Sequence, residues 1–146
     1  MPARITADTI GQDTRVATLS EQQAQLFLDP NYGVVTTLRR DGSPQMTVVW
    51  LDWDGEHVVF NTAEGRVKPR NIRRNPTVGV FVINPEDPYQ WIAVSGTAEM
   101  THDGAAEHID KLAKKYLGRD SFGLQPGEQR IIVRVRPERV TAYGVD

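Results

Sequence analysis

The chain carries short runs of β-branched and aromatic residues between turn-forming residues. Val34–Leu38 and Gln45–Leu51 are two such runs, and the Asp-Gly turn between them predicts a β-hairpin. A second turn, ending at Gly55, leads into a third run at His57–Thr62. The pattern therefore predicts three consecutive antiparallel strands, which form a meander.

Four more runs continue this pattern toward the C-terminus. Thr77–Ile83 and Tyr89–Met100 predict long strands, and Gly96 indicates a bulge or bend in the second of them. Arg130–Arg136 and Val140–Gly144 predict two further, separate strands. We therefore expect six or seven antiparallel strands.

Three segments carry the signals of helices. A capping box at Ser20 predicts a short helix that ends before Pro30. A proline suits the first position of a second helix, Pro69–Asn75, whereas Lys68, which precedes that proline, is expected to be extended. The apolar spacing of Gly104–Leu117 predicts the third and longest helix. The strands and these three helices predict a mainly β fold, a small barrel with helices on its ends.

Length and composition bound the function. A chain of 146 residues fits one domain, and we assign residues 1–18 to a flexible N-terminal arm and residues 19–146 to that domain. A formal net charge of −2 gives no global reason to expect nucleic acid or an anionic membrane as partner. The chain lacks cysteine, which excludes disulfides and Cys-ligated metals. Its first residues have no apolar segment and no later apolar run reaches about 20 residues, so we expect neither a signal peptide nor a bilayer-spanning segment. We expect a cytoplasmic protein without a membrane span.

The strongest chemical signal is a basic segment, 66–74, which places five cationic side chains in nine residues at the start of a helix that follows a strand. Helix N-termini carry unpaired N–H groups and a partial positive charge, so Arg66 and Lys68 beside one predict a phosphate site, with Asn71 as a further amide donor. The plainer alternative is a solvated basic helix face. A nucleic-acid patch has less support because no aromatic residues are interleaved.

These motifs resemble the pyridoxamine 5′-phosphate oxidase-like split β-barrel superfamily, and within it the actinobacterial flavin/deazaflavin oxidoreductases of group B, which use coenzyme F-420. The Arg-x-Lys-x-x-Asn element within Asn61–Pro76 is the most specific match. The other matching stretches are Val34–Leu38, Asp41–Gln45, Trp91–Ala98 and Val140–Gly144.

The resemblance implies a six- to seven-stranded antiparallel split β-barrel that dimerises, with two cofactor sites at the interface between the subunits. It implies that the domain is cofactor-binding, with no metal and no catalytic acid or base from a side chain. The implied cofactor-binding residues are Arg66, Lys68 and Asn71 at the phosphate, with Asn61 and Thr62 just before them, Thr47, Val48, Val49 and Trp50 along the ring, and Tyr89 and Trp91 reaching the cofactor of the partner.

The resemblance also implies an oxidoreductase in which the reduced cofactor transfers a hydride to an activated double bond in a small molecule such as a quinone, an enone or a tetrapyrrole. A deazaflavin with an oligoglutamate tail is a polyanion, and Arg70, Arg73 and Arg74 are surplus cations that could meet the tail. FMN on the same fold is the alternative cofactor, because the phosphate site would serve either. A third possibility is a protein that carries the coenzyme without turnover. Pyridoxamine phosphate oxidase itself is disfavoured, because its C-terminal substrate element is absent.

Other polar residues have plainer interpretations. His57, His102 and His108 lack metal-ligand spacing and are expected to be surface or structurally satisfied residues. The acidic residues at 52, 54 and 56 flank Gly55 and are expected to be turn formers. Trp50 has a second interpretation, as a core or interface residue. No dinucleotide-binding, Walker A or nucleophile-elbow motif occurs in the chain.

Overall fold

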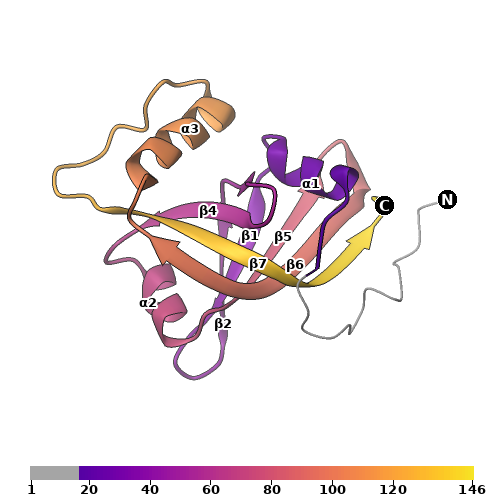
Figure 1. The fold of residues 1–146 in the computed structure, drawn as a ribbon, viewed down its shortest axis with the longest axis horizontal. Helices are drawn as coiled ribbons and strands as arrows, with labels where there is room; N and C mark the ends of the chain where they lie inside the picture. Colours follow the sequence, from indigo (N-terminus) through magenta and orange to yellow (C-terminus); the bar gives the residue numbers. More distant parts are fainter. Residues whose placement is uncertain (1–16) are drawn as a thin grey trace.

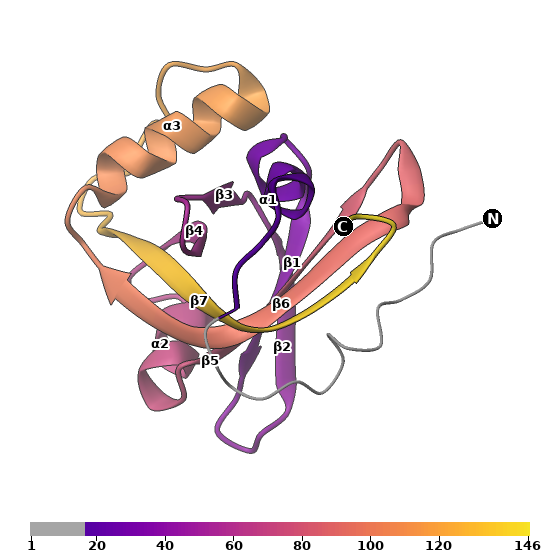
Figure 2. The same ribbon diagram turned by 45° about the vertical axis from the view of Figure 1, so that its right-hand side comes forward.

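The computed structural model describes residues 17–146, and seven of its strands form one antiparallel sheet that curls into a half-barrel (Figures 1 and 2). The strand order is β2-β1-β5-β6-β7-β4-β3, so β2 and β3 are the edge strands. This arrangement confirms the expected mainly β, split-barrel fold. The strands are β1 (Gly33–Leu38), β2 (Pro44–Val49), β3 (Asp52–Trp53), β4 (Val58–Ala63), β5 (Thr77–Asn84), β6 (Asp87–Thr101) and β7 (Arg130–Tyr143).

Three helices pack against this sheet, and their number agrees with the sequence prediction. α1 (Glu21–Leu28) packs against β3, β5 and β6; α2 (Val67–Arg74) packs against β1 and β4; α3 (Ala105–Leu117) lies over β4 and β7 (Figure 1). The capping box of α1 is present, because the Ser20 hydroxyl accepts from the Gln23 amide while the Gln23 side chain accepts from the Ser20 amide. In the described part of the chain, no helix is long and apolar enough to cross a membrane.

The C-terminal part differs from the expectation, because one continuous strand, β7, replaces the two that the pattern predicts. A register shift opposite Gly96 lets β7 bend without ending: Ser95 pairs with Arg139, and Gly96 pairs with Pro137. A Cβ on Gly96 would lie 1.7 Å from the Arg136 carbonyl oxygen, so only glycine allows this approach. The proline stands at the bulge, where its missing N–H breaks no regular ladder. The irregularity expected at Gly96 is thus confirmed, although the unpaired extra residue, Glu138, lies in β7, and the predicted break between two C-terminal strands is wrong.

The second helix also begins earlier than expected. α2 starts at Val67 with Arg66 as its N-cap, so Lys68 is helical rather than extended. The third helical residue, Pro69, still lies in the first turn, where a backbone N–H has no partner within the helix. The structure therefore places both Arg66 and Lys68 at the N-terminus of a helix.

The sheet has a buried concave face and an exposed convex face. The concave core is built from alternate residues of the strands and closed by Leu26 and Phe27 of α1. On the convex side, an outer apolar face runs across β2, β1, β5 and β6. It consists of Val34, Met46, Val48, Phe81 and Trp91, of which Met46 and Val48 are the most exposed, at 63% and 66%.

Residues 1–16 of the expected N-terminal arm lie outside the described residues. Of the remainder of that arm, Ala17 donates its backbone N–H to the carbonyl of Pro137 at 2.8 Å and packs against the core. Residue 17, which the sequence assigns to the arm, thus contacts the folded domain.

Candidate functional site

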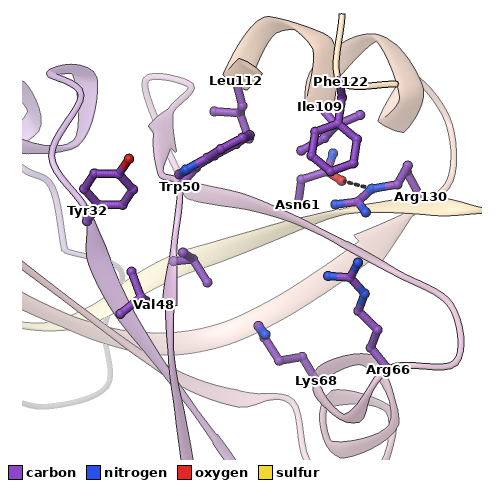
Figure 3. Close-up of a pocket in the computed structure, with 11 residues that line it drawn as sticks. Tyr32, Val48, Trp50, Asn61, Arg66, Lys68, Ile109, Leu112, Phe122 and Arg130 are labelled. Atoms are coloured by element: carbon purple, nitrogen blue, oxygen red, sulfur yellow. Dashed lines mark hydrogen bonds between the residues drawn. The ribbon is translucent and has the colours of Figure 1, made fainter. Parts of the chain in front are cut away.

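A cavity of about 350 Å³ lies between the end of β2, the neighbouring β4 and the underside of α3 (Figure 3). Its wall has two chemically different ends. Tyr32, Val48 and Trp50 lie at one end and the cations Arg66, Lys68 and Arg130 at the other (Figure 3). Phe122 lies between them, in contact with both Trp50 and Arg130. The lining residues are Tyr32, Val48, Val49, Trp50, Asn61, Arg66, Lys68, Ile109, Leu112, Phe122 and Arg130.

The cationic end is built by Arg66, Lys68 and Arg130. In the described part of the chain, neither Arg66 nor Lys68 has an acidic partner or a side-chain hydrogen bond. Burial lowers the pKa of Lys68, and the positive charge of Arg66 lowers it further. Uncompensated cations at a helix N-terminus are what an anion site requires. The two residues thus fit the phosphate of the cofactor that the family resemblance implies.

Arg130 lines the cavity but is not among the predicted site residues, because the sequence pattern marks it only as the first residue of a strand. It is 5% exposed, and its Nη1 donates to Glu128 Oε2 at 2.6 Å while its Nε donates to Asn61 Oδ1 at 2.8 Å. The guanidinium also lies over the ring of Phe122, with 5.0 Å to the centroid. Burial lowers the pKa of Arg130, the hydrogen bond to Glu128 opposes this, and Arg66 adds to the lowering. Arg130 is therefore a third, rigidly held cation in the cavity wall.

The aromatic end is organised around Trp50. Its ring stacks on that of Tyr116, with centroids 5.5 Å apart and planes 8° apart, and it meets Phe122 edge-on at 6.0 Å. Tyr32 also contacts Tyr116, with 5.4 Å between centroids. Such contacts fix large apolar side chains in place. The result is a flat, apolar wall of the kind that a planar ring requires.

The C-terminal turn of α3 fixes the position of this wall. Tyr116 accepts from the Leu51 N–H at 2.9 Å and donates to the Asn31 carbonyl at 2.7 Å, and Lys115 donates to the carbonyls of Phe27 and Leu51 at 2.6 Å each. Burial raises the pKa of Tyr116 to about 12 and lowers that of Lys115 to about 8. Leu51 directly follows Trp50, so these bonds hold the turn that carries Trp50.

A network of polar side chains joins Asp52, His108 and Asn61 beside the cavity. It shows that the expectation of a turn-forming role for Asp52 is wrong. Asp52 is no turn former but a buried residue of β3, 3.1 Å from Lys111 Nζ and 3.4 Å from His108 Nε2. Burial raises its pKa, but contacts with His108, the Trp53 amide and Lys111 outweigh this and hold the pKa well below its usual range. Asp54, in contrast, accepts from the backbone of Glu56 and His57, as a turn former does.

Six of the predicted cofactor residues line the cavity, and five do not. Val48, Val49, Trp50, Asn61, Arg66 and Lys68 are brought together there. Thr47 and Thr62 lie beside it on the same strands, and their buried hydroxyls have no hydrogen-bond partner within residues 17–146. Tyr89 and Trp91 lie on the far hairpin, where Trp91 stacks on Tyr143 and belongs to the outer apolar face.

Asn71 is buried rather than open to the cavity. Its Nδ2 donates to the Thr37 hydroxyl at 3.0 Å, and its Oδ1 accepts from Arg74 at 2.8 Å. Of the surplus cations, Arg73 pairs with Glu64 at 2.6 Å, and neither it nor Arg70 or Arg74 lines the cavity. In this structure Asn71 anchors α2 to β1, and the case for a polyanionic tail at Arg73 and Arg74 is weaker than the sequence indicates.

Within residues 17–146 no cluster of three or more His, Cys, Asp or Glu side chains could hold a metal ion. His57 pairs with Asp54 at 3.0 Å, and His102 pairs with Glu64 at 2.9 Å. Both match the expectation that they are structurally satisfied. His108, whose side chain is only 10% exposed, belongs to the polar network with Asp52 and Asn61.

The curled antiparallel sheet, with the cations Arg66 and Lys68 at the start of α2, defines the class of this protein. The chain belongs to the pyridoxamine 5′-phosphate oxidase family, whose model matches residues 19–144. It is similar to an F420H(2)-dependent biliverdin reductase of Mycobacterium tuberculosis (strain CDC 1551 / Oshkosh), with 27% identity over 84% of this chain and 86% of that protein.

Two solved structures support the same assignment at different levels. A structure described as an F420 reductase is 35% identical, with a TM-score of 0.73 over 84% of this chain and 98% of that one. General Stress Protein 26 of Bacillus anthracis is 20% identical, with a TM-score of 0.63 over 84% of this chain and 92% of that one. The second likeness shows the fold alone, whereas the first is close enough to show the family.

Proposed function

We propose that this protein is a coenzyme F-420-dependent oxidoreductase that reduces an activated double bond in a small molecule. The observation that carries the proposal is the pairing of two uncompensated cations, Arg66 and Lys68, with the apolar slot beside Trp50 in one cavity. A ligand that is anionic at one end and flat and aromatic at the other matches both ends. The reductases similar to this chain are named for that coenzyme.

The edge position of β2 supports placing the ring along residues 47–50. Within residues 17–146, β2 pairs only with β1, so backbone groups on its other side have no strand partner there. Free N–H and C=O groups at a sheet edge can bind the polar edge of a heterocycle. In this proposal Thr47, Val48, Val49 and Trp50 line the ring, and Asn61 and Thr62 lie next to it.

When bound, the reduced deazaflavin supplies a hydride, which is the chemistry that a side chain cannot provide. The chain contributes position and environment: Arg66 and Lys68 bind the phosphate, Trp50 orients the ring, and Ile109 and Leu112 of α3 keep water from it. The proposal assigns no side chain as a catalytic acid or base and takes the proton from solvent. We propose quinones, enones and tetrapyrroles as the substrate classes, and the cytoplasm as the compartment.

We also propose a homodimer with the cofactor site at its interface. Val48 supports this arrangement because it lines the cavity and is also part of the outer apolar face. Covering that face with a second copy would bury exposed apolar surface and add a wall to the cavity. Tyr89 and Trp91 lie outside the cavity of their own chain, so in this proposal they reach the site of the partner.

FMN is the second candidate cofactor, and one observation favours it. Arg73 and Arg74 are engaged within the chain, so the cavity offers sites for a phosphate more clearly than for a long anionic tail. Asn71 is buried and does not line the cavity, so in this structure it is not placed to contact the phosphate. A carrier that binds F-420 without turnover shares the same site and differs only in its activity.

The decisive experiment is a fluorescence titration of the purified apoprotein with oxidised F-420 and, separately, with FMN. Preferential binding of F-420 at micromolar concentration or tighter supports the proposal, and preferential binding of FMN replaces it with the second candidate. If neither binds, the anion site is assigned wrongly. A panel of quinones and enones with reduced F-420 then separates a reductase from a carrier, because a carrier shows no turnover.

A further inference from the structure

The orientation of the Asn61 side chain follows from two neighbours whose chemistry is unambiguous. Asn61 Nδ2 lies 3.0 Å from the Ala105 carbonyl oxygen, which can only accept, and Oδ1 lies 2.8 Å from Arg130 Nε, which can only donate. The reverse orientation would place two acceptors together at Ala105 and two donors together at Arg130. The amide of Asn61 is therefore fixed with its oxygen toward Arg130.

This orientation decides the state of His108. Its Nδ1 lies 3.0 Å from Asn61 Nδ2, and because that nitrogen donates, Nδ1 must accept and carry no proton. The neutral ring then carries its proton on Nε2, which is buried and faces Asp52 Oδ2 at 3.4 Å. No group within residues 17–146 forms a hydrogen bond of good geometry with Nε2, so Asp52 acts on it as a nearby anion rather than as a hydrogen-bond acceptor. The histidine therefore links Asp52 to Asn61 in a single tautomer.

Charged groups on neighbouring elements hold a negative charge at the Nε2 side of His108 and a positive charge beyond Asn61. Asp52 of β3 is also bound by Lys111, 3.1 Å away, so it stays an anion opposite Nε2. Arg130 of β7 stands on the other side of Asn61 and is paired with Glu128. His108 is thus placed between an anion and an amide whose oxygen accepts from a cation.

We propose that His108, oriented by Asp52, is a positioning residue for Arg130 and acts through the Asn61 amide. This inference rests on the proposed function, in which Arg130 is a third cation facing the anionic part of the ligand. With Nε bound to Asn61 and Nη1 bound to Glu128, two of the three nitrogens of the guanidinium are held where Arg130 lines the cavity. Without His108, Asn61 Nδ2 keeps the Ala105 carbonyl as its one acceptor, so the amide that accepts from Arg130 Nε is held by one hydrogen bond fewer.

A double-mutant cycle tests this proposal with oxidised F-420 as the probe. We expect His108→Ala to weaken binding about threefold to tenfold, the scale of one hydrogen bond. His108→Asn keeps an acceptor near the position of Nδ1 and should restore affinity to within about twofold. In Arg130→Lys, which keeps the charge but lacks Nε–H, adding His108→Ala should change affinity by less than about twofold. His102→Ala is the matched control, because His102 pairs with Glu64 outside the cavity.

A loss of equal size in both backgrounds would show that His108 only supports packing of α3, and no loss in the wild-type background would also overturn the proposal. A second measurement does not depend on the ligand. In ¹⁵N-labelled free protein at pH 8, we expect His108 Nδ1 to be unprotonated and the Arg130 Nε–H to exchange more slowly than in His108→Ala. The opposite tautomer, or equal exchange, overturns the proposal. If wild-type protein binds no F-420, the proposed function fails, and this measurement still decides the role of His108.

Discussion

The clearest test of the anion site is Lys68→Met, which removes the charge and keeps most of the aliphatic stem. Lys68 is half-buried at the start of α2, and within residues 17–146 no acidic side chain neutralises it. A hydrogen bond to a charged group contributes about 1.5–3 kcal/mol, which corresponds to roughly tenfold to 150-fold in affinity. Because Lys68 is partly exposed, solvent screens its charge, so we expect the lower part of that range, about tenfold to thirtyfold.

The same variant has an opposite effect on the free protein. Burial and the charge of Arg66 both lower the pKa of Lys68, which means that its charged form is unfavourable before an anion binds. Removing the charge should therefore leave the free energy of unfolding unchanged or raise it slightly, while binding weakens. Loss of binding through general destabilisation would give the opposite sign in the unfolding experiment.

The assay is the fluorescence titration with oxidised F-420, together with urea unfolding of the free protein. Lys114→Met is the matched control, because Lys114 is exposed on α3 and pairs with Asp120 rather than facing the cavity. The difference between the two variants should shrink at about 1 M salt, where the Debye length is about 3 Å. Unchanged affinity in Lys68→Met, or the same loss in Lys114→Met, would refute the assignment of Lys68 to the phosphate.

Three further outcomes are expected. The pKa of Asp52 is lower in the folded protein than its unfolded value of 3.8, so the ionised carboxylate stabilises the fold above about pH 4, and this stabilisation is lost as the pH falls further. The free energy of unfolding, measured from pH 6 to pH 2, should therefore decrease less steeply in Asp52→Asn than in wild type. Tyr116→Phe leaves the Leu51 N–H and the Asn31 carbonyl without this partner and should cost about 1–3 kcal/mol in thermal or urea unfolding, with a smaller effect counting against the anchoring of the Trp50 turn. Phe81→Glu places a charge in the outer apolar face and should shift a wild-type dimer toward monomer in sedimentation at micromolar concentration; a wild-type monomer would contradict the interface site.

Local signals in the sequence predict the parts of the fold whose cause is local. The capping box at Ser20 and the apolar spacing of α3 each act within a few residues, and both helices form where expected. The continuity of β7 could not be predicted, because the polar residues around Pro137 interrupt the strand pattern and the bulge depends on a glycine in another strand. The sequence predicts that the second helix begins at Pro69, two residues after its actual start at Val67, because a proline is tolerated anywhere in the first turn.

The candidate site divides in the same way. Arg66 and Lys68 are detectable because charge, helix start and preceding strand coincide within one short segment. Tyr116 supports the Trp50 turn through a bond to Leu51, 65 residues away in the chain, and Arg130 is held in the cavity wall by Asn61, 69 residues away, so no local pattern marks either residue. Asn71 shows the converse: its spacing matches a family motif, yet the amide is buried between Thr37 and Arg74.

The distribution of charge in the cavity explains how a protein with a net charge of −2 can hold three cations close together. Glu128 compensates Arg130, so that cation can remain buried without a ligand. Arg66 is exposed and solvated, which leaves Lys68 as the half-buried cation whose charge is least satisfied in the free protein. An anion that reaches Lys68 relieves this cost and gains its full interaction with the α2 N-terminus, so binding energy is concentrated at the phosphate end. The apolar slot beside Trp50 then selects among phosphate-bearing ligands by the shape of their ring. Substitutions at the cationic end should therefore change affinity, whereas substitutions at the aromatic end should change which ring is preferred.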